Sequence, residues 1–262
     1  MTALRWAQSA IQVRPQTETR LLDWFEPLHD PGGFISRTVL RLDQLAAQRG
    51  VRLYPQGDFR ALTTIVEAHR SQGTVQMPHV NPDYSTVGPD NGFWIYGIDA
   101  DGRPATTQAG RYYDFTGTTL AEELASFRFF YDQPGLHLTE GCFVRTPPEA
   151  SRITGSALAS GTIWVRPDLR GPDKDRIILS SVLSKLTRFV GLAQWWPETA
   201  LTFSSYNLYD RGVVSNCGYL HKAFPVDWVF PFGAAPSSGM FWMSRDEMLA
   251  WAASDFRPLA AA

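Results

Sequence analysis

The feature that most constrains the fold is a strand, a tight turn and a long amphipathic helix in direct succession. Residues 156–165 predict a strand, and Pro167-Asp-Leu-Arg-Gly-Pro172 predicts a turn. Residues 173–195 then carry apolar residues at helical spacing, and residues 200–204 predict another strand. Two strands joined by a helix of this length are expected to lie parallel in one sheet.

The rest of the chain also alternates between helical and strand patterns. Helices are predicted near 17–25, 40–46, 59–70, 120–131, 208–217 and 246–253, and strands at 51–54, 93–98, 105–115, 226–230 and 240–243. The sequence therefore predicts an α/β fold with a mixed central sheet. We expect residues 1–50 to form a short helical N-terminal segment, packed on a domain that covers residues 51–262.

The charge balance argues against several classes of partner. Lys and Arg number 24 and Asp and Glu 26, a net charge of −2, so no overall electrostatic attraction to nucleic acid or anionic membranes is expected. No apolar run approaches the ~18 to 20 residues of a membrane span, and the first residues lack a signal-peptide pattern. Only two cysteines occur, without C-x-x-C spacing, so we expect a cytoplasmic protein.

The common catalytic and metal-binding motifs are absent from the sequence. Cys217 and His221 have ligand-like spacing, but Gly218 between them predicts a helix end, and no metal is expected. Cys142 and His137 offer a thiol nucleophile with a base, which would indicate a hydrolase; a buried structural cysteine is the more common case.

The turn before the long helix is a candidate anion site. The first N–H groups of a helix have no partner within it, and the helix dipole makes that end positive, so a pyrophosphate fits there. An aspartate that caps the helix is the competing interpretation. Four cations and three carboxylates flank the turn, a local charge of 4 − 3 = +1: Arg166, Arg170, Lys174 and Arg176 against Asp168, Asp173 and Asp175.

At these residues the chain resembles the GNAT superfamily of acyl-CoA N-acyltransferases. Val165-Arg-Pro-Asp-Leu-Arg-Gly171 is similar to that family's V-x-P-x-x-R-G at the end of the fourth core strand. Asn207 and Gly218-Tyr219 resemble its N…G-F ending, and the 93–115 hairpin resembles its second and third strands. The resemblance covers about residues 51–250 in element order, with motifs mostly between 160 and 245.

The resemblance implies a sheet that splays between its fourth and fifth strands and holds acetyl-CoA or another acyl-CoA as co-substrate. An amine of a small-molecule or peptide acceptor would attack the thioester directly. A homodimer is left open. The implied cofactor-binding residues are Ile163, Trp164, Val165, Arg170, Gly171, Lys174, Asp175, Arg176 and Asn207. The acceptor is expected near the 71–92 loop and the hairpin, beside His79, Asp83, Tyr84, Asp90, Trp94 and Tyr96.

Two departures from the family pattern bear on activity. Asp173 and Asp175 replace small residues in the phosphate turn, where side chains crowd phosphates and carboxylates repel them. Val214 stands where the family often has a tyrosine acid, so Tyr206 or Tyr209 becomes the candidate catalytic acid. The alternative is a degenerate, non-catalytic GNAT-fold binding or interaction protein, with tryptophans such as those at 195–196 in its interface.

Overall fold

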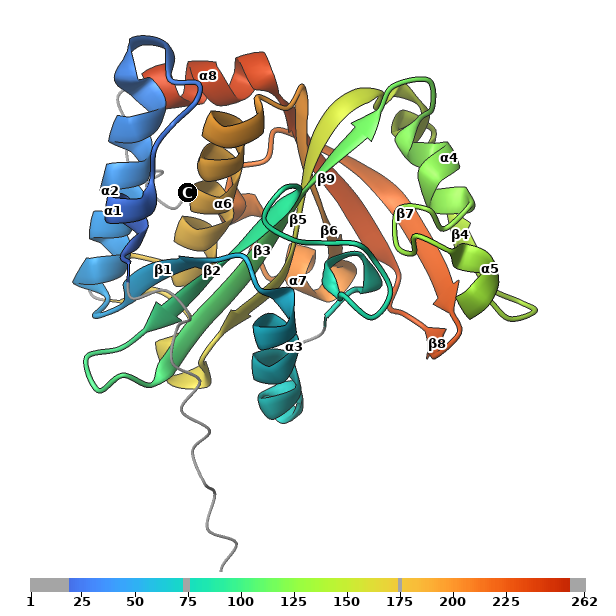
Figure 1. Cartoon of the computed structure of the whole chain (residues 1–262), viewed down its shortest axis with the longest axis horizontal. Helices are drawn as coiled ribbons and strands as arrows, with labels where there is room; N and C mark the ends of the chain where they lie inside the picture. Colours follow the sequence, from blue (N-terminus) through green and yellow to red (C-terminus); the bar gives the residue numbers. More distant parts are fainter. Residues whose placement is uncertain (1–18, 73–75, 174–175, 255–262) are drawn as a thin grey trace, which may run out of the picture.

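The computed structural model describes residues 19–72, 76–173 and 176–254 (Figure 1). Its strands are β1 (Arg52–Gln56), β2 (Gly92–Ile98), β3 (Pro104–Phe115), β4 (Phe143–Arg145), β5 (Gly155–Val165), β6 (Thr199–Ser205), β7 (His221–Phe230), β8 (Gly233–Ala234) and β9 (Ser238–Ser244). They form one sheet in the order β1-β2-β3-β5-β6-β9-β7-β4, with β8 on β7. Among the described strands, only β5 and β6 pair in parallel, which confirms the predicted mixed α/β fold.

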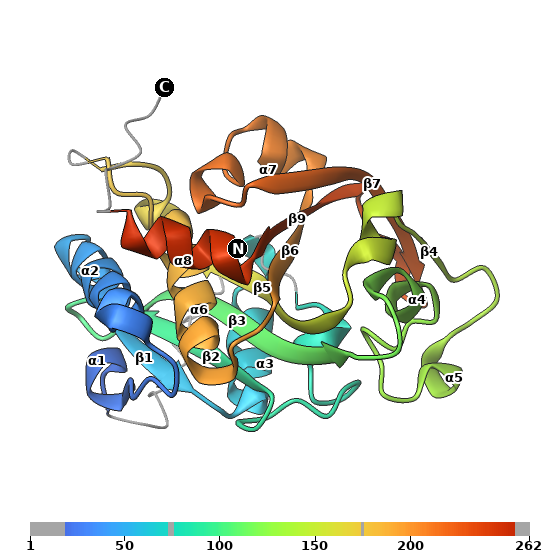
Figure 2. The same cartoon turned by 90° about the horizontal axis from the view of Figure 1, so that it is seen from above.

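Helices cover both faces of this sheet. They are α1 (Leu21–Trp24), α2 (Phe34–Gln48), α3 (Phe59–Ala68), α4 (Leu120–Ala125), α5 (Pro134–His137), α6 (Leu179–Trp195), α7 (Tyr206–Asp210) and α8 (Arg245–Ala253). Helices α2, α6 and α8 share one apolar core on one face, and α3 packs into a second core on the other (Figures 1 and 2). Residues 1–18 of the predicted N-terminal segment lie outside the described residues. Residues 255–262 at the C-terminal end do so as well.

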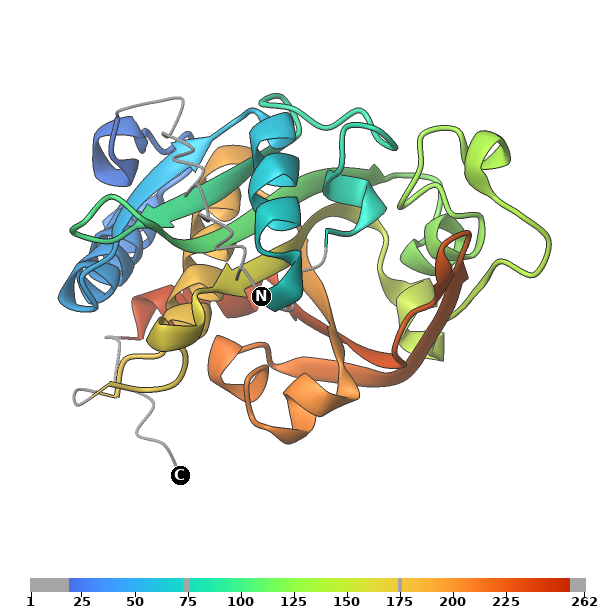
Figure 3. The same ribbon diagram turned by 90° about the horizontal axis from the view of Figure 1, so that it is seen from below.

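The parallel pair separates halfway along its length. Residues 157–160 of β5 pair with 199–202 of β6, and beyond Ser160 and Thr202 each strand continues without the other. Figure 3 shows β6, in orange, running away from the yellow β5 toward α7. A bulge in β5 accompanies the separation, because its register against β3 shifts where Thr162 adopts a positive φ of 52°. The splay that the GNAT resemblance implies is present.

Helix α6 packs tightly under the separating strands. It buries most of its length, and Gly191 allows a close approach, since a Cβ there would lie 2.4 Å from Leu158 of β5. The helix begins at Leu179, six residues later than predicted. Arg176 holds a left-handed φ of 60°, which a helix does not permit, and the Asp173 carboxylate accepts the Ile177 N–H at 2.8 Å.

Other predicted boundaries also changed. The helix predicted over 120–131 ends at Ala125, because Phe127 is left-handed with φ 61° and the following aromatic residues turn into the core. The helix predicted over 208–217 is divided into α7 and the 3₁₀ turn η6 (Ser215–Cys217). Residues 116–154, between β3 and β5, form an insertion with α4, α5 and β4.

Candidate functional site

A cavity of about 620 Å³ opens where β5 and β6 separate. Four segments build it: the end of β5, the turn after it, the first residues of α6, and the chain from α7 to η6. The lining residues are Gln72, Ile163, Trp164, Val165, Leu169, Arg170, Gly171, Pro172, Ile178, Leu179, Ser180, Asn207, Leu208, Arg211, Val213 and Asn216. The site thus joins an unpaired strand edge to the amino end of a 17-residue helix.

The amino end of α6 gives the cavity a positive pole. Leu179 and Ser180, the first two helical residues, line it, and N–H groups at these positions have no partner within a helix. Asp173 is not a lining residue: one of its oxygens accepts the Ile177 N–H, and the other lies 3.6 Å from Arg49 Nε. The carboxylate therefore does not plug the cavity.

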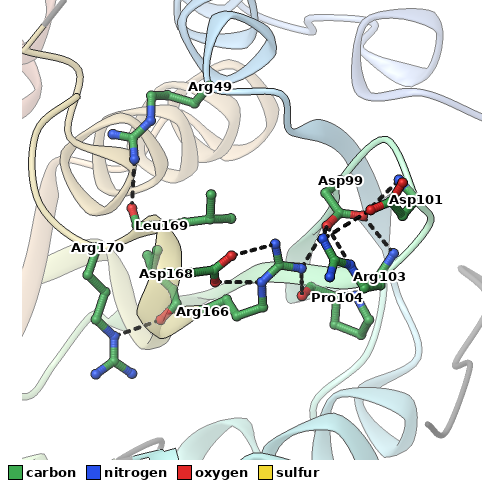
Figure 4. Close-up of polar contacts among 10 residues, drawn as sticks. Arg49, Asp99, Asp101, Arg103, Pro104, Arg166, Asp168, Leu169 and Arg170 are labelled. Atoms are coloured by element: carbon green, nitrogen blue, oxygen red, sulfur yellow. Dashed lines mark hydrogen bonds and ion pairs between the residues drawn. The ribbon is translucent and has the colours of Figure 1, made fainter. Parts of the chain in front are cut away.

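Arg49, just past α2, holds the turn after β5 in place. Its Nη2 donates to Leu169 O at 2.9 Å (Figure 4). Its Nη1 donates to Gly171 O at 3.0 Å and also to Ile177 O. Three carbonyls of one turn are thus tied to a side chain 8% exposed to solvent. The helical segment before β1 is part of the support of the cavity.

A second polar network fixes the end of β5 to the β2–β3 hairpin. Asp99 in the hairpin turn pairs with Arg166 at 2.9 Å and with Arg103 at 2.8 Å, and Arg166 also binds Asp168 at 2.7 Å (Figure 4). Burial alone would raise the pKa of Asp99. Hydrogen bonds from the Arg103 backbone and from both guanidinium groups outweigh burial and lower the pKa to about 2. The Arg166 side chain is therefore engaged in ion pairs with Asp99 and Asp168 that hold the strand end in place.

Six of the nine cofactor-binding residues expected from the resemblance line this one cavity: Ile163, Trp164, Val165, Arg170, Gly171 and Asn207. Arg176 is not among the lining residues, and Lys174 and Asp175 lie outside the described residues. Arg170 donates to Val165 O at 2.8 Å and to Gln72 O at 2.7 Å, which ties the loop after α3 to the cavity.

The two tyrosines predicted as catalytic acid lie beside the cavity and do not line it. Tyr206 stacks on Phe224 with ring centroids 5.0 Å apart, and Tyr209 contacts the same ring and receives a hydrogen bond from Lys222. Their catalytic role stays a prediction. The sequence reasoning missed Arg211, a lining cation that makes no ion pair with any described residue. Its position four residues after Asn207, on one helical face, was the available signal.

The expected acceptor residues divide into two groups. Trp94 and Tyr96 are buried in the core under α3, and Asp83 forms an exposed ion pair with Arg60 at 3.3 Å. His79, in contrast, lies against the separating strands: its Nε2 would be 3.5 Å from a Cβ on Gly161. Burial and the charge of Arg111 lower the pKa of His79 to about 3, so its ring is neutral.

Neither of the other candidate chemistries gains support. The Cys142 thiol lies 3.5 Å from the Thr139 hydroxyl, and His137 stacks on Tyr131. Across residues 19–72, 76–173 and 176–254, no three His, Cys, Asp or Glu side chains gather in a way that could hold a metal. In the same part of the chain, no helix is long and apolar enough to cross a membrane.

The chain was compared with known proteins. No family model and no curated protein matches it. Among solved structures, a mutant of spermidine N-acetyltransferase SpeG from Vibrio cholerae aligns at 6% identity and TM-score 0.43, over 76% of this chain and 96% of that one. Arabidopsis thaliana NAA60 in complex with a bisubstrate analogue aligns at 10% identity and TM-score 0.41, over 74% of this chain and 97% of that one. The yncA protein of Salmonella typhimurium with acetyl-CoA aligns at 12% identity and TM-score 0.35, over 74% of this chain and 95% of that one.

Proposed function

We propose that this protein is a GNAT-like N-acyltransferase that moves an acetyl or other acyl group from acyl-CoA to an amine. The cavity at the divergence of β5 and β6 carries the proposal, because it brings six residues expected from the sequence to one place. An unpaired strand edge, an apolar wall and a helix amino end in one cavity suit a molecule with an amide arm, a thioester and a diphosphate.

The residues present fit the parts of acyl-CoA. Beyond Ser160, no described strand pairs with the β6-facing edge of β5, so backbone groups there can bind the amides of a pantetheine arm. Ile163, Leu208 and Val213 supply the apolar wall along that arm. The diphosphate would lie at the α6 amino end, where Arg211 adds a positive charge.

The reaction would then be a direct attack on the bound thioester. Acyl-CoA supplies the activated acyl carbon, and backbone N–H groups at the β5 bulge can stabilise the oxyanion that forms. The acceptor would approach over Gly161, which keeps part of its surface exposed and faces the His79 loop. The acceptor we propose is the amine of a small molecule or a peptide, consistent with a site open to one side of the sheet.

Binding of acetyl-CoA to the intact chain tests the proposal first. A ligand at 100 times its Kd stabilises the folded state by roughly 2.7 kcal/mol, which raises Tm by roughly 5–10 °C for a domain of this size. Calorimetry gives the Kd, and Arg211→Gln is expected to weaken it about fivefold by removing one cation from the phosphates. The matched control is Arg152→Gln, an exposed arginine in η4 (Pro148–Arg152), remote from the cavity.

Transfer is tested by release of the CoA thiol with a panel of amines. The panel holds spermidine, a primary alkylamine, an arylamine and a short peptide with a free amino terminus. Thiol release that depends on both protein and amine supports the transferase. Binding without transfer to any amine favours the non-catalytic alternative, and absence of binding by any acyl-CoA overturns the transferase and likewise favours that alternative.

A further inference from the structure

The bulge in β5 places an irregular peptide group in the wall of the cavity. In the register between β3 and β5, Gly161 and Trp164 have partners. The two residues between them, Thr162 and Ile163, have none in that register. Ile163 lines the cavity and is 37% exposed. The peptide group that joins Thr162 to Ile163 therefore lies in the bulge and borders the cavity.

Thr162 holds this peptide group in a strained conformation. Its φ of 52° lies in the left-handed region, where the Cβ of a β-branched residue crowds the backbone. The preceding residue, Gly161, would adopt a positive φ without this strain, yet its φ is not positive. Strained conformations persist where the surrounding structure holds them. The bulge therefore depends on a contact that favours it.

Thr107 of β3 supplies that contact. Its hydroxyl donates to Thr162 O at 3.3 Å, and the residue is 0% exposed. A second threonine, Thr202 of β6, donates from its hydroxyl to Ser160 O at 2.9 Å. The two flanking strands thus hold carbonyls of β5 on either side of Gly161, at the point where β5 and β6 separate.

The bond from Thr107 also sets the direction of the next N–H group. Residues 162 and 163 are joined by a trans peptide, in which C=O and N–H point in opposite directions. Because Thr162 O is directed at Thr107, the Ile163 N–H is directed away from that side chain. Beyond Ser160, no described strand pairs with the β6-facing edge of β5, where the cavity opens.

We propose that Thr107 is a positioning residue for acyl transfer, an assignment that rests on the proposed function. Its hydroxyl holds the peptide group so that Ile163 N–H donates to the acyl carbonyl oxygen. The amine nitrogen forms a bond to the acyl carbon, the carbonyl π electrons move to oxygen, and the N–H stabilises this oxyanion. When those electrons return, the carbon–sulfur bond breaks and its electron pair leaves on sulfur. The nitrogen loses one proton to water, and the sulfur takes one from water.

Three substitutions separate this role from packing. Thr107→Val replaces the hydroxyl with a methyl group, so the peptide group can rotate and relieve the strain at Thr162. Thr107→Ser keeps the hydroxyl. The matched control is Thr106→Val on the same strand, because the Thr106 hydroxyl is equally buried and has no hydrogen-bond partner among the described residues. We expect all three variants to show a cooperative urea transition and to bind acetyl-CoA within about threefold of wild type, since the cavity lining is unchanged.

The first measurement is transfer to the amine of the panel that wild type acylates fastest. Removal of one oxyanion donor typically lowers kcat about 100-fold or more. Displacement of that donor in Thr107→Val is expected to lower kcat at least about tenfold at unchanged KM for acetyl-CoA, as for an interaction made only in the transition state. Thr107→Ser and Thr106→Val should stay within about threefold of wild-type kcat.

The second measurement observes the N–H group itself and needs no variant of Thr107. In protein with isoleucine labelled by heavy nitrogen, Ile163→Val identifies the Ile163 amide signal by its loss from the spectrum. In wild type, this signal is expected to move when acetyl-CoA replaces CoA, because only acetyl-CoA carries the acyl carbonyl. The difference should shrink in Thr107→Val and remain in Thr106→Val.

The outcomes that contradict the proposal differ from those that contradict the proposed function. Unchanged kcat in Thr107→Val, or equal losses in Thr107→Val and Thr107→Ser, overturns the positioning role. An Ile163 amide signal that is the same with CoA and acetyl-CoA also overturns it, even if Thr107→Val does not fold. A wild-type protein that transfers to no amine instead refutes the proposed function, and the positioning role falls with it.

Discussion

The two sides of the separating strands are built in opposite ways. On one side, here called the cavity side, β5 faces α6 and α7 across an open cavity lined by two arginines, a few uncharged polar residues and apolar residues. On the other, the aromatic side, Phe129 of the 116–154 insertion and Trp228 of β7 both pack against Phe203 of β6, and Phe130 of the insertion contacts Trp228. The same pair of strands therefore borders an open cavity on one side and a packed core on the other.

The source of the difference is the insertion between β3 and β5. Its strand β4 pairs with β7 through Phe143 and Val229, and Tyr113 of β3 stacks on Phe129 at a centroid distance of 4.6 Å. Stacked rings bury large apolar areas and fill a volume tightly. The cavity side is bordered instead by a turn and a short helix whose carbonyls are held by Arg49, Lys185 and Arg188. Tightly packed rings and open space thus lie on different sides of the strands.

The strongest test of the difference between the two sides is a pair of truncations, one on each side. Phe129→Ala removes a ring 1% exposed and is expected to lower the free energy of unfolding by about 3–5 kcal/mol. Leu208→Ala, 37% exposed at the cavity, should cost less than about 1 kcal/mol yet weaken acetyl-CoA binding. Urea unfolding and calorimetry measure both. Equal losses of stability would mean that the cavity side is as tightly packed as the aromatic side.

Arg49 tests whether the cavity side depends on distant support. Arg49→Met removes a charged donor from three carbonyls, and we expect unfolding free energy to fall by roughly 2–3 kcal/mol. Acetyl-CoA affinity should fall about tenfold, because the turn beside the α6 amino end is released. Arg52→Met, an exposed arginine on β1, is the matched control. Reduced stability with unchanged acetyl-CoA affinity would mean that the turn held by Arg49 takes no part in binding.

The ion pairs of Asp99 should make the free energy of unfolding depend on pH. Its pKa of about 2 lies below the ordinary 3.8, so the folded state holds the carboxylate more firmly than the unfolded state. This contribution, roughly 2 kcal/mol, is fully present above pH 3.8 and is lost as pH falls through 2. Asp99→Asn should therefore be less stable than wild type at pH 7 and equal to it near pH 2 in urea titrations. A constant difference across that range would assign the loss to packing.

Much of the framework could be predicted from local pattern. The 156–165 strand, the long helix and the 200–204 strand are near one another in sequence, and their pattern was sufficient for the parallel pair. The motif residues at the end of β5 and Asn207 were expected near one site, and the structure brings them to one cavity. Their binding role remains a prediction.

What escaped prediction depends on contacts between distant residues. Arg49 reaches Leu169, 120 residues away, and nothing in the local sequence around either residue indicates the pairing. The residues after Ala125 continue an apolar pattern that predicts helix, but burial of Phe127, Phe129 and Phe130 in the aromatic side requires a left-handed turn. The local sequence around Lys185 does not indicate that η6 covers its side chain; only the fold shows that contact.

The smallest change in stability is expected at Gly161, where the two sides meet. Gly161 follows the last β5–β6 pair, and an alanine methyl would lie 3.5 Å from His79 Nε2, an ordinary van der Waals distance. Gly161→Ala should therefore alter unfolding free energy by less than about 0.5 kcal/mol. It should leave acetyl-CoA affinity unchanged, since Gly161 is not a lining residue of the cavity.

Amine transfer is where Gly161→Ala should show its effect. A methyl group over the strand gap narrows the path between β5 and the His79 loop, and a displacement of about 1 Å in the approach of the amine can cost about 100-fold in rate. We expect kcat/KM for the amine to fall at least tenfold. Gly135→Ala in α5, where an added Cβ meets nothing within 4 Å, is the control. Unimpaired transfer would mean that the amine reaches the thioester from the cavity side, and that the aromatic side serves stability alone.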